Sequence, residues 1–241
     1  MINGLRKLEY RGYDSSGLGI ICGDEIQVRK APGKIGKLQE LMKTDVMSLG
    51  TVGISHTRWA THGAPNQVNS HPHFDCSKKI LIVHNGIIEN YEELRTALEK
   101  RGHKFLSETD TEVVAHLIEE NLNGDFLTAV RKSFRQLTGA FALGIICTDH
   151  PDTLIAARIG SPLIIGLGEK ENYIASDVPA ILDLTKKIIY LKDGEMAVIT
   201  KDNVAVSDFN GKKVTPKVDT VKFSAEAVQK QGSITLCSKK C

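Results

Sequence analysis

The order of apolar patterns along the chain constrains its fold more than any other feature. Short apolar runs of strand type come first, helical spacings dominate the middle, and strand-type runs return after Gly139. Strands, then helices, then strands, with few strict β-α-β alternations, favour a layered α+β fold over a doubly wound sheet. The expected strands are 18–22, 26–30, 51–54, 80–83, 140–147, 153–158, 163–166, 173–175, 188–191, 196–200 and 204–207, and the expected helices are 34–43, 89–101, 111–122 and 126–137.

The composition is that of an ordinary globular protein. The 241 residues are 41% hydrophobic and 25% charged, enough for one large domain or two small ones. The 31 basic and 29 acidic residues nearly cancel and no basic block stands out, which argues against nucleic acid or an anionic membrane as the main partner. No apolar run is long enough to span a membrane, and residues 1–7 lack the apolar core of a signal peptide. Five scattered cysteines without C-x-x-C spacing predict neither a disulfide framework nor a zinc knuckle, and they fit a reducing cytoplasm.

Two polar stretches follow apolar runs of strand type and carry most of the candidate chemistry. Residues 55–63 read Ser-His-Thr-Arg-Trp-Ala-Thr-His-Gly after the run 51–54, and residues 84–90 read His-Asn-Gly-Ile-Ile-Glu-Asn after the run 80–83. Sheets commonly present binding and catalytic groups where their strands end. Spacing alone also allows two ordinary strand-to-loop exits, with the histidines hydrogen-bonded only locally.

Five motifs in a fixed order resemble one enzyme family. They lie at residues 8–17, 55–63, 69–73, 84–90 and 107–112. From Met1 to about Gly232 the chain is similar to the glutamine amidotransferase domain of the glucosamine-6-phosphate synthases, also called glutamine–fructose-6-phosphate aminotransferases. The first and last motifs argue against amidophosphoribosyltransferase or asparagine synthetase. The resemblance implies a four-layer α-β-β-α sandwich of the N-terminal nucleophile hydrolase type.

The resemblance also implies a reaction and a set of residues. The side-chain amide of L-glutamine is hydrolysed through a thioester, which requires oxyanion donors and recognition of both charged ends of the amino acid. Asn85 and Gly86 match the oxyanion hole, Arg58 matches the ligand of the α-carboxylate, and Asp110 matches the partner of the α-ammonium group. Other matched positions line the glutamine pocket (Thr61 and His71), lie near its mobile cover (Trp59 and His62), or position the N-terminal strand (Arg11).

Some of these residues have plain structural alternatives. The pair 85–86 can form a simple turn, and Asp110 can cap the helix that follows it. His62, His71 and His73 suggest a metal site, because a one-residue gap aims two rings to one face of a strand. No carboxylate or cysteine ligand stands at a helpful spacing from them, and the family implies no metal or other cofactor in this domain.

The chain departs from the family at both ends. Family members begin with a cysteine whose thiol is the nucleophile and whose α-amine is the base, whereas this chain begins Met1-Ile2-Asn3-Gly4. We therefore expect the family's first strand to be missing from the middle of one sheet, and the chain as written to fold poorly and to lack glutaminase activity. Cys22, in an apolar strand, is expected to be inert core. Residues 233–241 leave the family pattern but permit its continuation in another reading frame, which suggests a frameshifted or fragmentary gene product.

The expected organisation is an amidotransferase domain over residues 1–211 and a polar tail over residues 212–241. The tail would lead toward two sugar-isomerase domains, absent here, that bind fructose 6-phosphate. The resemblance implies L-glutamine as the ligand, a homodimer in the full-length parent, and a cytoplasmic role in amino-sugar synthesis leading to UDP-N-acetylglucosamine. An alternative keeps the fold without the chemistry: a non-catalytic glutamine-binding module that retains Arg58 and Asp110.

Overall fold

The computed structural model describes residues 1–60 and 62–222. The helices are α1 (Ile2–Arg6), α2 (Ile35–Thr44), α3 (Tyr91–Lys100), α4 (Glu112–Asn121) and α5 (Phe126–Phe134), with 3₁₀ turns η1 (Glu9–Arg11) and η2 (Val178–Ala180). The strands are β1 (Ser15–Cys22), β2 (Glu25–Pro32), β3 (Gly53–Arg58), β4 (His73–Phe74), β5 (Ile80–Ile88), β6 (Gly139–Cys147), β7 (Leu154–Ile159), β8 (Ile164–Leu167), β9 (Asn172–Ala175), β10 (Lys187–Tyr190), β11 (Glu195–Ile199), β12 (Val204–Asp208), β13 (Lys213–Val214) and β14 (Val218–Thr220).

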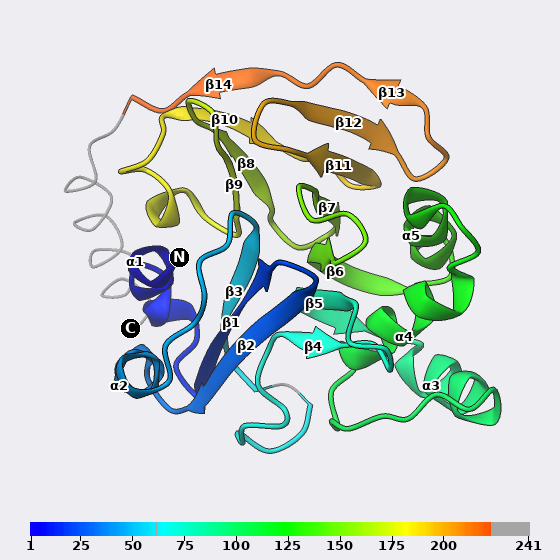
Figure 1. Ribbon diagram of the computed structural model, residues 1–241. Coiled ribbons are helices and arrows are strands. Elements are labelled where there is room, and N and C mark those ends of the chain that lie inside the picture. Colours follow the sequence, from blue (N-terminus) through cyan, green and yellow to red (C-terminus); the bar gives the residue numbers. More distant parts are fainter. Residues whose placement is uncertain (61, 223–241) are drawn as a thin grey trace, which may run out of the picture.

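These elements stack in four layers (Figure 1). The largest sheet has seven strands in the order β13-β12-β11-β7-β6-β5-β4, and α3, α4 and α5 pack on one of its faces. Its other face packs against two smaller sheets, β2-β1-β3 and β14-β10-β8-β9. Helices α1 and α2 cover the first of these sheets from outside. The α-β-β-α sandwich expected from the sequence is therefore confirmed.

Strand β5 shows how the apolar runs build this stack. Ile80 and Ile82 belong to the core under the helices, whereas Leu81 and Val83 belong to the core between the sheets. Successive side chains of a strand point to opposite faces, so a strand covered on both faces needs an unbroken apolar run. The pattern of residues 80–83 thus places β5 in the middle of the sandwich.

The smaller sheets do not join into one. Within the described residues, β3 pairs only with β1, and β9 pairs only with β8. Both edge strands lie over Gly144 of β6: a Cβ placed there would stand 3.8 Å from Ile54 Cγ2 of β3 and 2.7 Å from Ile174 Cδ1 of β9. The layer therefore has the interruption that was expected in the middle of one sheet.

Both polar stretches begin as strand, contrary to the prediction that the strands end before them. Strand β3 continues through Arg58 and β5 continues through Ile88. Asn85 and Gly86 pair with Ala142 and Phe141 of β6, so the simple-turn alternative for 85–86 is wrong. A run of ladder hydrogen bonds keeps these residues extended although their side chains are polar.

The start of the polar tail adds strands to both layers. Strand β13 pairs with β12, and β14 pairs with β10, so residues 213–220 run along one side of the sandwich (orange in Figure 1). Residues 223–241, including the stretch 233–241 that leaves the family pattern, lie outside the described residues. The domain boundary at residue 211 remains a prediction. Within the described ranges, no helix has both the length and the apolar character needed to cross a membrane.

Candidate functional site

The Asp110 carboxylate lies at the centre of the candidate site. It is 3% exposed, and its Oδ2 accepts a hydrogen bond from the Ile88 backbone N–H of β5 at 2.8 Å. His84 Nδ1 lies 3.9 Å from Oδ2, and His62 Nδ1 lies 3.8 Å from Oδ1. The helix cap position is occupied by Thr111, and no side chain caps the helix there. Asp110 therefore ties the start of α4 to β5, and the capping alternative is wrong.

Arg58 brings a buried positive charge to the same region. Its guanidinium donates to the carbonyl oxygens of residues 62–64, with the bond to Gly63 at 3.0 Å. Burial lowers the pKa of Arg58, while the carboxylates of Asp14 and Asp110 act to raise it. A guanidinium keeps its charge under such a shift because its ordinary pKa is above 12. The site therefore holds a permanent positive charge on Arg58, and the nearby Asp110 carboxylate stabilises that charge.

Asn85 and Gly86 are held in place by their neighbours. Asn85 Oδ1 lies 2.9 Å from His56 Nε2, and since an amide oxygen only accepts, the ring must carry its hydrogen on Nε2. The Asn85 amide NH₂ is thereby directed away from His56. Gly86 is exposed with φ +129°, and a Cβ would stand 2.0 Å from the Ala140 carbonyl oxygen, so only glycine fits. The pair presents two N–H donors at one end of β5.

Four buried histidines lie on β5 or next to it and hold this strand in place. The rings of His56 and His71 stack with centroids 4.2 Å apart, and His71 Nδ1 accepts the His84 backbone N–H at 3.3 Å. Thr111 Oγ1 lies 3.0 Å from His84 Nδ1 and 3.4 Å from His71 Nε2. Burial lowers the pKa of all four rings, His73 included, and lowers that of His56 to about 4. At neutral pH the cluster is uncharged.

Acidification is expected to destabilise the fold through this cluster. The pKa of His56 is lowered from 6.5 to about 4, so between these values the unfolded chain binds more protons than the folded one. This penalty is absent above pH 6.5 and grows as the pH falls toward 4, reaching about 3 kcal/mol at about 1.4 kcal/mol per pKa unit. Urea unfolding between about pH 7 and pH 5 measures it.

His56→Gln is the matched control for this pH series, because glutamine retains an N–H donor for Asn85 but does not titrate. We expect a shallower pH dependence of the free energy of unfolding in this variant. Equal slopes in the two proteins would show that His56 does not titrate with the depressed pKa.

The structure brings six of the nine predicted site residues into one connected region: Arg58, His62, His71, Asn85, Gly86 and Asp110. Trp59 is 61% exposed and packs edge-on against Tyr13. Arg11 Nη1 lies 3.4 Å from the Ser176 carbonyl oxygen, just after β9. Thr61 lies outside the described residues.

Sequence reasoning missed the supporting roles of His56, His84 and Thr111. Strand periodicity could have found the first of these, since His56 and Arg58 are two residues apart on β3 and face the same side. The roles of His84 and Thr111 depend on contacts across 27 residues of sequence, which no local pattern encodes.

A family model described as a glutamine amidotransferase domain matches residues 56–183, more than half of the chain. The chain belongs to this family. The match includes the second half of β3, all of β5 and the start of α4, the elements that carry the connected region described above. The family assignment made from the five motifs is therefore confirmed.

Relatives of this amidotransferase domain are enzymes. It is 50% identical over 232 residues to the glutamine–fructose-6-phosphate aminotransferase (isomerizing) of Caldanaerobacter subterraneus subsp. tengcongensis, covering 96% of the chain and 38% of that protein. The enzyme of the same name from Thermococcus kodakarensis is 50% identical over 235 residues, covering 96% and 39%. The chain thus spans less than two fifths of the length of these relatives. Among solved structures, a glutamine phosphoribosylpyrophosphate amidotransferase from B. subtilis superposes with a TM-score of 0.74 at 26% identity, covering 86% of this chain and 46% of that one.

Proposed function

We propose that this domain binds L-glutamine between Arg58 and Asp110. The guanidinium holds the α-carboxylate, for which its planar fork of donors is suited, and the Asp110 carboxylate holds the α-ammonium group. The observation that supports this best is the burial of both groups, 4% and 3% exposed, in one network with β5. When both charged groups of glutamine are held in this way, the orientation of its Cα is fixed. The side chain and its amide can then extend in only one direction.

In the proposed reaction, Asn85 and Gly86 stabilise the oxyanion. A cysteine thiol adds to the amide carbon, the oxygen becomes negative, and the Asn85 amide and the Gly86 N–H donate to it. The thiol proton passes through the α-amine to the leaving nitrogen, so that ammonia departs and a thioester remains. Water then hydrolyses the thioester to glutamate and restores the thiol.

Three cysteines lie in the part of the chain that the structure describes, and each is engaged elsewhere. Cys22 Sγ contacts the Ser48 carbonyl oxygen at 3.3 Å, and Cys147 is buried in the core under the helices. Cys76 Sγ lies beside His103 and His116. We therefore propose that the 241-residue polypeptide binds glutamine without turning it over.

The wider role follows from the relatives' names. We propose that the domain corresponds to the glutaminase half of a full-length glutamine–fructose-6-phosphate aminotransferase, in which ammonia from glutamine serves glucosamine 6-phosphate synthesis in the cytoplasm. Fructose 6-phosphate would bind to domains outside this chain, and the full-length protein would be a homodimer. The 50% identity to such enzymes supports this role over the phosphoribosylpyrophosphate amidotransferases, which share the fold at 26% identity.

Calorimetry with L-glutamine tests the binding proposal. Asp110→Asn keeps an oxygen for the Ile88 N–H but removes the charge, and Arg58→Lys removes the planar fork. Each is expected to weaken L-glutamine binding roughly 10- to 100-fold, since hydrogen bonds to charged groups contribute about 1.5–3 kcal/mol.

Asp149→Asn, which breaks only an exposed pair with Lys79, is the control and is expected to bind as the parent chain does. D-glutamine is expected to bind much more weakly than L-glutamine, because inversion exchanges the places of the charged ends. Undiminished binding by folded Asp110→Asn would contradict the assignment.

A further inference from the structure

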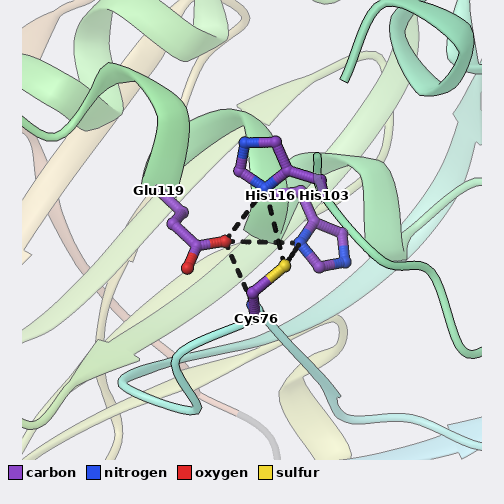
Figure 2. A group of neighbouring side chains, drawn as sticks. All are labelled: Cys76, His103, His116 and Glu119. Atoms are coloured by element: carbon purple, nitrogen blue, oxygen red, sulfur yellow. Dashed lines mark hydrogen bonds and ion pairs between the residues drawn. The ribbon is translucent and has the colours of Figure 1, made fainter. Parts of the chain in front are cut away.

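A second cluster of polar side chains lies apart from the candidate glutamine site. It consists of Cys76, in the turn between β4 and β5, His103, after α3, and His116 and Glu119, one turn apart on α4 (Figure 2). One ligand atom from each, the Cys76 sulfur, a nitrogen from each histidine and a Glu119 carboxylate oxygen, lies within 4.8 Å of all the others. Three segments separated in sequence thus point donor atoms at a single place.

In both histidines the Nε2 atom has a hydrogen-bond partner outside the cluster, and this partner determines whether the Nδ1 atom carries a hydrogen. His103 Nε2 lies 3.1 Å from Glu120 Oε2, and His116 Nε2 lies 3.4 Å from Glu112 Oε1. Carboxylates only accept hydrogen bonds, so a neutral ring in either place carries its hydrogen on Nε2. Both Nδ1 lone pairs then face the Glu119 carboxylate and the Cys76 sulfur. Four electron-pair donors that converge in this way form a site suited to a metal cation.

Four of the six distances between the donor atoms lie near those of tetrahedral coordination, and the other two lie within 4.8 Å. Cys76 Sγ lies 3.6 Å from His103 Nδ1 and 3.4 Å from His116 Nδ1, and Glu119 Oε2 lies 3.1 Å and 3.4 Å from the same two nitrogens. Metal–nitrogen and metal–oxygen bonds of about 2.0–2.2 Å and a metal–sulfur bond of about 2.3 Å give tetrahedral edges of about 3.3–3.6 Å. To bind one ion at the centre, the side chains would have to bring the remaining two pairs of atoms to similar distances.

We propose that Cys76, His103, His116 and Glu119 bind one Zn²⁺ ion. One thiolate, two imidazoles and one carboxylate form a donor set that suits zinc, and four protein ligands make a closed, structural site. The hydrogen bonds from the histidines to Glu112 and Glu120 are the carboxylate–histidine contacts that orient imidazole ligands. The Lys104 backbone N–H, 3.4 Å from the sulfur, offers a donor to the thiolate.

The ion would clamp the two connecting segments onto α4. The turn that holds Cys76 and the segment that holds His103 contain no helix or strand. Each is tied to α4 by hydrogen bonds to the carboxylate of Glu119. Because α4 begins directly after Asp110, the clamp also supports the helix beside the candidate glutamine site. The proposal does not depend on glutamine binding.

Titration of the metal-depleted full chain with Zn²⁺ and with Co²⁺ tests the proposal. We expect one high-affinity equivalent of Zn²⁺ by calorimetry, a higher melting temperature in its presence, and for Co²⁺ a thiolate charge-transfer band with visible bands of tetrahedral geometry. Cys76→Ser is expected to remove the charge-transfer band and to weaken Zn²⁺ binding at least 100-fold. Glu120→Gln, which alters the partner of His103 and an exposed pair with Arg101, is expected to weaken it about tenfold.

Matched controls separate this site from the other thiols. Cys22→Ser, and a double variant Cys237→Ser/Cys241→Ser, are expected to leave the stoichiometry, affinity and cobalt spectrum unchanged. If the cluster is a hydrogen-bonded network with protonated histidines, folded parent chain will show no charge-transfer band and no Zn²⁺-dependent melting shift, which overturns the proposal. A band that persists in Cys76→Ser but disappears in the tail variant overturns it equally.

Discussion

Extending the chain ahead of Met1 with a strand that begins with the family's N-terminal cysteine is expected to create glutaminase turnover at an ordinary enzymatic rate, roughly 1–10³ s⁻¹. The 241-residue chain presents oxyanion donors and opposite charges for the substrate, but its described cysteines are engaged elsewhere. A terminal cysteine would supply a thiol nucleophile and, in its α-amine, the base. Release of glutamate from L-glutamine, measured before and after the extension, checks the expectation.

The same extension is expected to raise the stability of the fold. In the part of the chain that the structure describes, strands β3 and β9 have unpaired edges over Gly144, and a strand between them would satisfy both. At about 2–4 °C in melting temperature for each kcal/mol in a domain of this size, a few net hydrogen bonds correspond to several degrees. Thermal unfolding of the extended and original chains measures the gain.

An extension that begins with alanine in place of the cysteine separates the two effects. It is expected to keep the added stability and to show no turnover. Cleavage from a tag must expose the cysteine as the first residue, because its free amine is part of the proposed chemistry. Clear turnover by the original chain, or a stable cysteine-led chain that binds glutamine and releases no glutamate, would contradict the proposed reaction.

The elements of the fold were largely predictable because their apolar periods are clear. The helices at 35–44 and 112–121, for example, were expected within a residue or two of where they lie. The polar ends of β3 and β5 were missed, because ladder pairing to a neighbouring strand decides whether residues such as Arg58 and Asn85 remain extended. Pairing partners are distant in sequence, and local propensity does not contain them.

The residues of the candidate site were likewise predictable only in part from the sequence. Motifs placed Arg58, Asn85 and Asp110 together without any geometry, because the family resemblance carried their roles. Cys76 and His116, 40 residues apart, belong to no spacing rule for metal ligands, so only the packing of the β4–β5 turn against α4 reveals them. The sequence suggested a possible metal site at His62, His71 and His73. In the structure, His71 and His73 belong instead to the cluster of buried histidines that contacts β5.

Asn85→Ala, made in the cysteine-led chain, is expected to lower kcat by roughly 10²–10³-fold while KM changes little. The amide donates to an oxygen that becomes negative only as the thiol adds, so its loss is felt in the transition state more than in substrate binding. Steady-state glutamate release gives both constants. Asp149→Asn, which alters an exposed pair with Lys79 just before the start of β5, is the control and is expected to leave both unchanged.

His56 offers an independent check on how the amide acts. Its Nε2–H holds Asn85 Oδ1, and so aims the NH₂ at the substrate. His56→Leu removes that restraint and is expected to lower kcat less than Asn85→Ala does, whereas His56→Gln, which retains a donor, is expected to restore most of it. If Asn85→Ala raised KM and left kcat intact, the amide would be a binding group, and the oxyanion would have to be stabilised by the Gly86 N–H and other donors. The split between kcat and KM therefore decides whether β5 contributes an oxyanion hole or only a wall of the glutamine pocket.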